Sequence, residues 1–245
     1  MADTVFPLLL PASCRVCKQP IETFTRVPVC ETCWQSVRAY AGEECAQCGM
    51  FMDHPGLLHG TTLCGYCRRG AFGFERARSF GSYDGALREI LQQYKYHGFR
   101  PLARPLGVYL AQTLKRLNDG PLDLVLPVPL HRRRERQRGF NQSGLLAAQV
   151  GKLCGIRLGG KDCVRVRDTP PQAGLRGAER RKNVKGAFAV PDPERVRGLR
   201  VLLVDDVLTT GATVDACARA LKDAGAKGVW VLTLARARAG PLDVL

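Results

Sequence analysis

The chain has 245 residues, and its 37 Lys and Arg residues outnumber its 22 Asp and Glu residues, which gives a formal net charge of +15 and a pI near 9.7. This length suffices for one large domain, or for a medium domain with a small one attached. With 45% hydrophobic and 24% charged residues, the composition is typical of a globular protein and excludes a disordered chain. Most of the excess charge lies in residues 121–198, which hold 17 basic and 7 acidic side chains, whereas residues 1–70 hold 6 of each.

The N-terminus carries a short apolar run at residues 5–10, interrupted by Pro7 and followed by Pro11. Asp3 precedes this run, whereas a signal peptide begins with basic residues and has a longer apolar stretch. No run approaches the ~18 apolar residues that span a bilayer. We therefore expect a cytoplasmic protein without a membrane span, whose cysteines stay reduced unless a metal binds them.

The first quarter of the chain contains most of its cysteines. Eight of the 11 form four Cys-x-x-Cys pairs, separated by 12, 11 and 15 residues. Two cysteines at this spacing place both thiolates at the tip of a tight turn, and two such turns complete a tetrahedral Cys₄ zinc site. Four turns therefore predict two structural zinc ions, held by Cys14, Cys17, Cys30, Cys33, Cys45, Cys48, Cys64 and Cys67.

Other interpretations of these cysteines fit less well. Disulfides are rare in the cytoplasm, and thioredoxin-like redox motifs do not come four in a row. Sequential pairing of the turns is the simplest arrangement, and the spacing leaves an interleaved one open. His54 and His59 are expected in solvent, because eight cysteines already fill both sites. The three remaining cysteines are expected as buried core thiols: Cys154, Cys163 and Cys217.

From about residue 76 the pattern changes to alternating strands and helices. It predicts an α/β fold with a parallel sheet covered by helices on both faces, in which ligands bind beyond the carboxyl ends of the strands. We therefore divide the chain into a cysteine-rich module, residues 1–70, and an α/β domain, residues 71–245. In chain order we expect a strand at 77–83, a helix at 85–94, a helical face over 106–117, a strand at 123–129, a helix at 143–153, strands at 164–167, 187–190 and 201–204, a helix at 213–224 and a strand at 229–235.

The segment 201–213 combines an apolar strand, two carboxylates, a loop with hydroxyls and a glycine, and the start of an amphipathic helix. Backbone N–H groups at a helix N-terminus, together with threonine hydroxyls, form a cradle for a monophosphate, and Gly211 lets the backbone approach it closely. Asp205 and Asp206, set slightly apart from that cradle, suit the hydroxyls of a sugar or a hydrated Mg²⁺. The segment therefore predicts a site for a ribose 5-phosphate.

Two other interpretations apply to this aspartate pair. It can serve only as a cap at the end of a strand. It can also form the acidic pocket of a receiver domain, but that pair normally ends the first strand, with a further aspartate well downstream. Here 39 residues follow Asp206, so we favour the sugar-phosphate site.

At these residues the sequence resembles a known family. Residues 201–213 match the signature of type I phosphoribosyltransferases, which bind phosphoribosyl pyrophosphate. Further segments, together with the N-terminal cysteine module, resemble one branch, the ComF/GntX-like competence proteins. The resemblance implies a type I phosphoribosyltransferase fold behind a double zinc ribbon. The segments are Tyr-Lys-Tyr-His-Gly at 94–98, Pro-Val-Pro-Leu at 127–130, Arg-Gly-Phe-Asn-Gln at 138–142, and Gln172, Leu175, Arg180 and residues 183–188.

The resemblance also implies a role for each part of the site. Asp205 and Asp206 would be the catalytic pair, which binds the ribose hydroxyls directly or through Mg²⁺. The 5-phosphate would be bound by Thr209, Thr210, Gly211, Ala212 and Thr213. Pyrophosphate would lie at Pro129, Leu130, His131 and Arg132. Residues 168–185 would form a mobile loop over the site, with contacts from Gln172, Arg176, Arg180, Lys182 and Lys185.

The charge pattern agrees with these implied roles. A pyrophosphate leaving group needs cations around it, and five arginines lie within residues 132–138. Further basic residues follow at Arg176, Arg180, Arg181, Lys182 and Lys185. Not every arginine of the two stretches can face one small site, so we expect only two or three to contact pyrophosphate. The basic stretch 121–198 then indicates a local trap for a small polyanion.

The resemblance implies a Mg²⁺-dependent phosphoribosyltransferase, a glycosyltransferase that transfers a pentosyl group, active in natural competence through DNA uptake or the use of extracellular DNA. The alternative is a non-catalytic module. It would sense phosphoribosyl pyrophosphate or a nucleotide, or bind single-stranded DNA while the zinc module recruits a helicase-type or DNA-uptake partner. The strand residues 233–238 indicate no particular acceptor base, which keeps the alternative open. Against DNA binding, the aromatic residues of 121–198 are only Phe140 and Phe188, few for stacking on bases.

Overall fold

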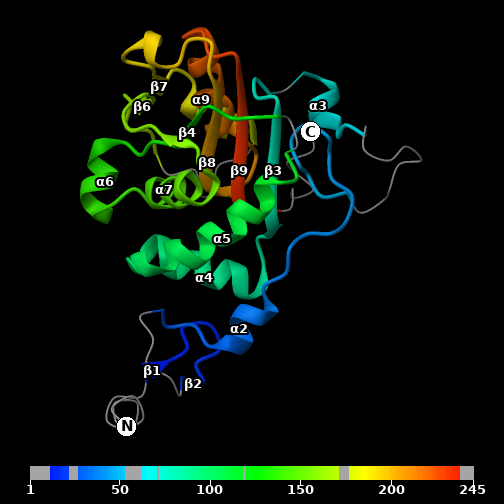
Figure 1. Ribbon diagram of the computed structural model, residues 1–245, viewed down its shortest axis with the longest axis vertical. Helices are drawn as coiled ribbons and strands as arrows, with labels where there is room; N and C mark the ends of the chain where they lie inside the picture. The colour runs from blue at the N-terminus through cyan, green and yellow to red at the C-terminus, as the bar shows by residue number, and fades with distance from the viewer. Residues whose placement is uncertain are drawn as a thin grey trace.

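A five-stranded parallel sheet forms the centre of the protein (Figure 1). The computed structural model describes residues 12–21, 27–52, 62–70, 72–117, 120–170 and 177–237. Every neighbouring pair in the strand order β3-β9-β8-β4-β5 is parallel, which confirms the predicted fold class. The strands are β3 (Arg76–Ser82), β4 (Leu124–Pro127), β5 (Arg157–Leu158), β8 (Arg200–Leu208) and β9 (Gly228–Arg236).

The central strands are apolar on both faces because both faces are covered. In β8, Leu202 and Val204 belong to one buried cluster, whereas Val201 and Leu203 belong to the other. All nine residues of β9 are buried. A continuous apolar run of this kind is the usual pattern of a parallel strand between two layers.

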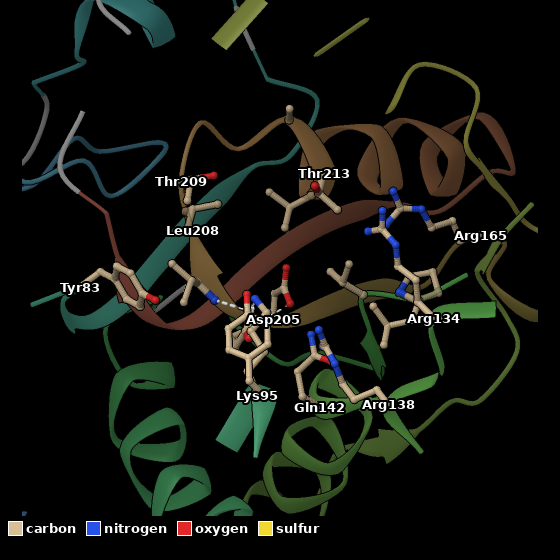
Figure 2. Close-up of a pocket in the computed structure, with 18 of the residues that line it drawn as sticks. Tyr83, Lys95, Arg134, Arg138, Gln142, Arg165, Asp205, Leu208, Thr209 and Thr213 are labelled. Atoms are coloured by element: carbon tan, nitrogen blue, oxygen red, sulfur yellow. Dashed lines mark hydrogen bonds and ion pairs between the residues drawn. The ribbon is translucent and has the colours of Figure 1, made fainter. Parts of the chain in front are cut away.

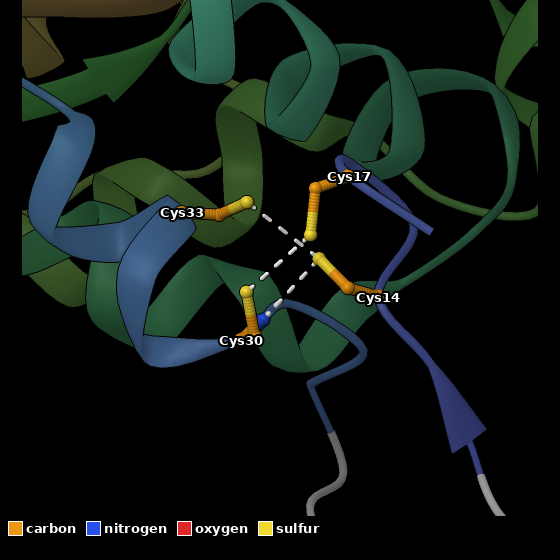
Figure 3. Close-up of side chains that lie close together, drawn as sticks. All are labelled: Cys14, Cys17, Cys30 and Cys33. Atoms are coloured by element: carbon orange, nitrogen blue, oxygen red, sulfur yellow. Dashed lines mark hydrogen bonds between the residues drawn. The ribbon is translucent and has the colours of Figure 1, made fainter. Parts of the chain in front are cut away.

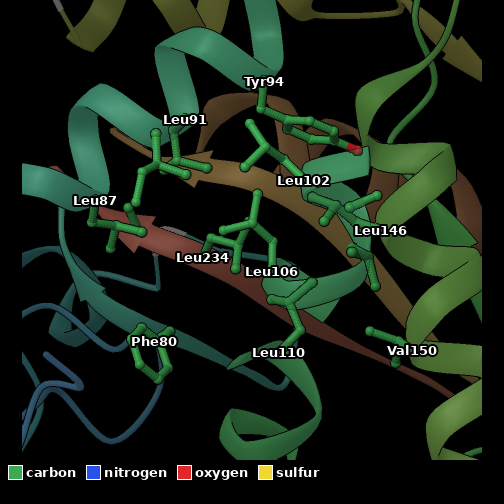
Figure 4. Packing of buried hydrophobic residues seen from close by; sticks show 14 of the residues in the cluster. Phe80, Leu87, Leu91, Tyr94, Leu102, Leu106, Leu110, Leu146, Val150 and Leu234 are labelled. Carbon is green, nitrogen blue, oxygen red and sulfur yellow. The ribbon is translucent and has the colours of Figure 1, made fainter. Parts of the chain in front are cut away.

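One face of the sheet packs against α4 (Gly85–Tyr96), α5 (Ala103–Leu114) and α7 (Gln142–Cys154). Helix α5 contacts β3 and β9, and α7 contacts β4 and β8. Leucine side chains from all three helices meet those of the sheet in this layer (Figure 4). The other face packs against α9 (Ala212–Asp223), which buries the expected stripe of Val214, Cys217, Ala218 and Leu221.

A separate two-stranded antiparallel sheet, β6 (Val164–Arg165) with β7 (Phe188–Ala189), lies outside the main sheet and packs on α9. The two strands were expected near these positions, but their pairing with each other could not be deduced from the sequence. Between them lies α8 (Gly177–Val184), inside the stretch expected as a mobile loop. Two further elements were not expected: the edge strand β5 and α6 (Arg132–Arg138).

Two expected boundaries differ in ways that concern the site. Helix α7 is capped by Asn141, whose Oδ1 accepts from the backbone N–H of Ser143 at 3.1 Å, and not by Ser143 itself. Strand β8 was expected to end at Val204 but continues to Leu208, because β9 pairs with it along its whole length. Both aspartates therefore lie inside a strand.

The N-terminal module contains short elements around two groups of four cysteines. We call Cys14, Cys17, Cys30 and Cys33 the first cluster, and Cys45, Cys48, Cys64 and Cys67 the second cluster. The first cluster packs through α2 (Glu31–Ser36) onto α4 and α5, where Trp34 meets Tyr109 edge-on at 6.1 Å. The module also contains β1 (Ala12–Ser13) paired with β2 (Pro20–Ile21), and α3 (Gly65–Arg68); short 3₁₀ turns lie at Arg100–Leu102 and Pro193–Arg195.

The remaining cysteines only partly match expectation. Cys163 and Cys217 are buried, as predicted, but Cys154 is half-exposed because it is the last residue of α7. Among the described helices, none is long and apolar enough to cross a membrane. The domain boundary after residue 70 stays a prediction.

Candidate phosphoribosyl site and zinc centres

A cavity of about 870 Å³ opens at the carboxyl ends of β4 and β8 (Figure 2). It lies where ligands bind in open parallel sheets. Its walls come from segments far apart in the sequence: the ends of β3 and α4, the loop after β4, α6, α7, β6, α8, and the turn from β8 into α9. The lining residues are Tyr83, Lys95, Tyr96, His97, Gly98, Val128, Pro129, Leu130, Arg134, Gln137, Arg138, Gln142, Arg165, Arg180, 205–209 and 211–214.

Asp205 and Asp206 lie in this cavity because β8 is longer than β4. Pairing between the two strands ends where Val204 lies opposite Pro127, whereas β8 continues beside β9 to Leu208. The chain of β4 then turns away through Pro129, which has no N–H to continue the ladder. Beyond that point β8 exposes one edge, and the two carboxylates occupy it.

The carboxylate of Asp205 is held in place by two hydrogen bonds. Its Oδ1 accepts from Ser143 Oγ at 2.7 Å and from the backbone N–H of Asp206 at 2.9 Å. Burial, and then the charge of Asp206, raises the pKa of Asp205 to about 7, although Lys95 and Ser143 act in the opposite direction. Ser143 is thus not a helix cap but a positioning group for the acidic pair.

Asp206 is 2% exposed and pairs with a lysine that was not predicted as a site residue. Nζ of Lys95, near the end of α4, lies 3.0 Å from Oδ2 of Asp206. Burial lowers the pKa of Lys95, but the charges of Asp206 and then Asp205 outweigh it, so that the pKa is raised above its ordinary value. Lys95 belongs to the Tyr-Lys-Tyr-His-Gly segment at 94–98. Only the presence of this family motif in the sequence could have indicated that Lys95 is a site residue.

The loop between β8 and α9 faces the same cavity. Thr209, Ala212 and Thr213 line it together with Gly211, whereas Thr210 is not among the lining residues and its Oγ1 accepts from the N–H of Ala212 at 3.4 Å. Gly211 has a φ of +81°, and a Cβ there would lie 2.8 Å from the Phe72 ring. Glycine is therefore required both by the turn and by the close ring.

The loop after β4 contributes differently from what the sequence implied. Pro129 and Leu130 line the cavity. His131 instead caps α6, with Nδ1 accepting from the N–H of Arg133 at 3.4 Å, and lies 3.6 Å from Asp168. Arg132 is exposed and does not line the cavity. The roles of these four residues toward pyrophosphate stay predictions.

Four other arginines face the cavity. Arg134 and Arg138 stand one turn apart on α6, so that one side of this helix points inward while Arg132 and Arg136 are exposed. Arg165 enters from β6 and Arg180 from α8. Because α6 and β6 could not be placed in space from the sequence, only Arg180 of these four was predicted individually.

Arg165 is the unusual member of this group. It is 8% exposed, and it forms no ion pair with any described carboxylate. Its Nη2 donates to Thr169 Oγ1, its guanidinium lies 5.4 Å from the Phe188 ring, and its Nε has no partner. Burial, and then the like charge of Arg134, lowers its pKa. A buried cation without a counter-charge is costly, which indicates that the site is built for an anion.

The first residues of the expected mobile loop, 168 and 169, contact arginines of α6. Arg134 donates to the carbonyl oxygen of Thr169, and Asp168 lies 3.7 Å from Arg133. Lys182 lines a smaller hollow of about 360 Å³ beside Thr169, and Lys185 is exposed just beyond α8. Gln172 and Arg176 lie outside the described residues.

The two sides of the cavity differ in character. Tyr83, which follows β3, lies on the opposite side of Asp205 from Arg134 and Arg165 (Figure 2). Its backbone N–H donates to the carbonyl oxygen of Arg236 at 2.9 Å, which holds it at the end of β9. The cavity is therefore cationic beside β4, acidic in the middle and aromatic beside β3.

Each cysteine cluster is suited to one zinc ion. The sulfurs of the first cluster, and separately those of the second, all lie within 4.8 Å of one another. Cys14 and Cys33 are 3.8 Å apart and Cys17 and Cys30 3.6 Å apart (Figure 3). Four converging sulfurs are the usual ligand set of structural zinc. The pairing is sequential, which decides between the two arrangements that the spacing left open.

Backbone N–H groups point at these sulfurs, as they do at metal-bound thiolates. Cys14 Sγ accepts from the N–H groups of Val16 and Cys30, both at 3.4 Å. Cys45 Sγ accepts from the N–H of Cys64 at 3.3 Å. Both centres thus fit zinc. His54 and His59 lie outside the described residues.

Comparison with known proteins assigns both parts of the chain. The family model of the double zinc ribbon domain matches residues 5–68, and that of the phosphoribosyl transferase domain matches residues 139–245. DNA utilization protein YhgH of Salmonella typhi is 34% identical over 233 residues, which cover 94% of this chain and 99% of that protein. The chain belongs to the ComF/GntX-like competence protein family.

Other members of this family are similarly related. Competence protein F of Haemophilus influenzae is 32% identical over 216 residues, which cover 85% of this chain and 90% of that protein. Competence protein ComFC of Bacillus subtilis is 25% identical over 221 residues, which cover 85% of this chain and 84% of that protein. Each alignment covers 85% of this ComF/GntX-like chain and therefore includes residues from both segments that the family models match.

Proposed function

We propose that the cavity binds phosphoribosyl pyrophosphate with Mg²⁺ and that the protein transfers the phosphoribosyl group to an acceptor. The observation that carries the proposal is the order of groups around Asp205 and Asp206. A glycine-bearing loop at a helix N-terminus lies on one side, and a group of arginines with a buried, unpaired member on the other. This order matches the order of charges in the ligand: phosphate, ribose and pyrophosphate.

Each part would act on one part of the ligand. The N–H groups at the start of α9 and the hydroxyls of Thr209 and Thr213 bind the 5-phosphate. Asp205 and Asp206 accept hydrogen bonds from the ribose hydroxyls. The arginine group stabilises the charge that develops on the departing pyrophosphate.

Mg²⁺ would enter as part of the substrate. It prefers oxygen ligands and keeps several of its waters, and Asp205 offers a carboxylate whose described hydrogen bonds both reach Oδ1. Lys95 already neutralises Asp206, so the pair suits a hydrated ion better than a bare one. The ion would share the charge of the leaving group with the arginines.

In such a transfer the residues of this chain would position the substrate and the acceptor. No protein nucleophile is needed when the C1–pyrophosphate bond weakens and the acceptor adds, provided that the reacting atoms are aligned and water is kept out. The described parts of the expected mobile loop, residues 168–170 and α8, lie beside the arginine group, and we expect this loop to close over the cavity.

The biological role we propose follows from the relatives. Their names place them in DNA utilization and competence, and this chain would act with them in DNA uptake or the use of extracellular DNA, in the cytoplasm. A phosphoribosyl acceptor derived from imported DNA is consistent with both the pocket and these names.

Calorimetric titration with phosphoribosyl pyrophosphate and Mg²⁺ tests the proposal. We expect binding by the wild type, loss of at least about tenfold in affinity for the Asp205→Asn/Asp206→Asn variant, and little change for Asp223→Asn, an exposed aspartate at the end of α9. Absence of binding, or equal binding by the double variant, would show that the cavity has another ligand.

A second candidate is a non-catalytic adaptor that binds single-stranded DNA and recruits a helicase-type partner through the zinc module. One observation favours it: Tyr96, beside the cavity, is 66% exposed and has Arg138 5.7 Å and Lys95 6.0 Å from its ring centre. An aromatic ring among cations suits a stacked base. Fluorescence anisotropy with labelled oligothymidylate, comparing wild type with Tyr96→Ala, would reveal this activity, and equal weak binding by both proteins would exclude it.

A further inference from the structure

The second cysteine cluster lies against the edge of the central sheet. The turn formed by residues 45–49 covers β3, where the N–H of Ala77 donates to the carbonyl oxygen of Gln47 at 2.7 Å. The approach is close: a Cβ at Gly49, which has a φ of +62°, would lie 2.6 Å from the carbonyl oxygen of Ala77. The turn thus pairs with a strand edge that would otherwise be open.

Two buried arginines hold this turn from the sheet side. Arg78 of β3 donates to the carbonyl oxygens of Cys45 and Ala46, and its Nε lies 3.0 Å from Glu44. Arg236 of β9 donates from Nη1 to the carbonyl oxygen of Cys48 at 3.2 Å, and its Nη2 lies 3.8 Å from Cys48 Sγ. They are 8% and 2% exposed.

The two arginines differ in their counter-charge. Arg78 has the carboxylate of Glu44, whereas Arg236 has no described carboxylate within ion-pair distance. The anionic group beside Arg236 is the second cluster itself, because four thiolates around a divalent zinc ion keep a net negative charge.

Arg236 is also directly connected to the 209–213 loop. Its backbone lies opposite Leu208, the last residue of β8, and the N–H of Ala237 donates to the carbonyl oxygen of Leu208 at 2.9 Å. Thr209 follows immediately. Arg236 therefore joins the second cluster to the strand ends from which the loop starts.

A second path leads from the turn to the other end of the loop. Nε2 of Gln47 donates to the carbonyl oxygens of Phe72 and Phe74, at 3.4 and 2.9 Å. The Phe72 ring lies against Gly211, and the N–H of Gly73 donates to Oδ1 of Asp215, in the first turn of α9, at 2.6 Å. Both ends of the loop are thus attached to the same zinc-binding turn.

We propose that Gln47 and Arg236 are positioning residues through which the second zinc centre holds the 209–213 loop in the shape that binds a phosphate. The first cluster has no such connection among the described residues: it packs on α4 and α5, on the helical face of the sheet. The two zinc centres therefore have different tasks, one supporting the helical layer and one supporting the binding loop. The phosphate part of this inference rests on the proposed function.

The test compares Gln47→Ala with Gln35→Ala in the full zinc-loaded chain. Gln35 is a matched control, because it is exposed on α2 beside the first cluster and its side chain donates to Glu31. Three quantities are measured: zinc per chain, amide hydrogen exchange over residues 209–215, and affinity for ribose 5-phosphate. For Gln47→Ala we expect unchanged zinc, exchange faster by about tenfold, and affinity weaker by roughly three- to tenfold; Gln35→Ala should match the wild type in all three.

A second pair of variants tests the Arg236 connection independently of Gln47. Arg236→Lys retains the charge beside Cys48, whereas Arg236→Met removes it, so exchange over residues 209–215 should rise more for Arg236→Met. The inference is overturned if exchange in this segment stays at the wild-type rate in Gln47→Ala and Arg236→Met, or rises equally in Gln35→Ala. If the wild type binds no ribose 5-phosphate, the proposed function fails, but the exchange measurement still decides whether the turn supports the loop.

Discussion

Nζ of Lys95 lies 3.0 Å from Oδ2 of Asp206, although the two residues are 111 positions apart in the chain. The ion pair joins the end of α4 to the carboxyl-terminal part of β8 and places one cation against Asp206, next to Asp205. Asp206 is buried and its neighbour Asp205 is partly exposed, so the repulsion between the two carboxylates must be offset. Lys95 is the described cation in contact with this pair.

Removal of this cation should destabilise the protein. We expect Lys95→Met to lower the free energy of unfolding by about 2 kcal/mol, below the full effect of breaking a buried pair because the Lys95 side chain is 27% exposed. Urea denaturation at neutral pH measures this difference. Lys152→Met, at an exposed lysine of α7, should change little. The double variant Lys95→Met/Asp206→Asn should recover part of the loss, and failure to do so would contradict the pairing.

The acidic pair should also make stability depend on pH. The pKa of Asp205 is raised from its ordinary 3.8 to about 7 by burial and by Asp206. Between these values the unfolded chain has lost the proton and the folded protein retains it, so stability falls as pH rises through this window. At a pH below 3.8, the pKa in the unfolded chain, Asp205 costs no stability. At a pH above about 7, the pKa in the folded protein, the full loss of stability is present.

Asp205→Asn should therefore remove this slope and be more stable than the wild type at pH 8. A pKa raised from 3.8 to about 7 corresponds to about 4 kcal/mol. Partial exposure of the carboxylate reduces the expected gain to about 1–3 kcal/mol. Urea denaturation from pH 4 to pH 8 measures the slope, and Asp223→Asn serves as the control. An unchanged slope in Asp205→Asn would assign the pH dependence to another group.

The sequence predicted correctly those features that depend on residues close together in the chain. The apolar run at Val201–Val204, the carboxylates and Gly211 were recognisable because strand, turn and helix signals follow one another there. The eight cysteines were recognisable because each pair has the Cys-x-x-Cys spacing of a zinc-binding turn. The structure confirms the parallel sheet, the two Cys₄ clusters and the α9 stripe.

Contacts between distant segments were not predictable in this way. Lys95 and Arg165 reach the cavity, and Ser143 reaches Asp205, only because α4, β6 and α7 pack around the end of β8. No spacing in the sequence encodes that arrangement. The length of β8 was underestimated because its last residues are held by pairing with β9 and not by their own apolar character. Arg132 was named because the resemblance implied it, whereas Arg134 and Arg138 face the cavity through the helix α6, which was not expected.

Arg165 should affect stability and binding in opposite directions. Replacing this buried, unpaired cation with methionine removes a desolvation cost, so we expect Arg165→Met to be as stable as the wild type or more stable by up to about 2 kcal/mol. Its affinity for Mg²⁺-pyrophosphate should fall by about tenfold or more, since a charged contact is lost. Calorimetric titration and urea denaturation give the two numbers. Arg136→Met, on the exposed side of α6, should change neither, and normal pyrophosphate binding by Arg165→Met would remove Arg165 from the site.

The zinc assignment predicts about two zinc ions per chain by atomic emission. Cys17→Ser alters the exposed ligand of the first cluster, and Cys64→Ser alters a buried ligand of the second. Each should lower the zinc content by about one ion, and each should lower stability because metal binding supplies much of the folding energy of so small a module. A folded wild-type protein without metal would contradict the assignment.

Gly211 should tolerate no side chain. At a φ of +81°, alanine adds a backbone strain of about 1–2 kcal/mol, and its Cβ would lie 2.8 Å from Cε1 of Phe72, so that the ring or the loop must move. We expect Gly211→Ala to lower the free energy of unfolding by about 2–3 kcal/mol and to weaken binding of ribose 5-phosphate by about tenfold or more.

Gly225→Ala is the matched control at the other end of α9: φ is +93° there, but the nearest atom is 3.5 Å away, so the strain is present without the clash. Gly225→Ala should lose stability and keep its affinity. Gly211→Ala/Phe72→Ala should regain the part of the stability that the clash costs, and equal affinities for Gly211→Ala and the wild type would show that the loop does not bind phosphate.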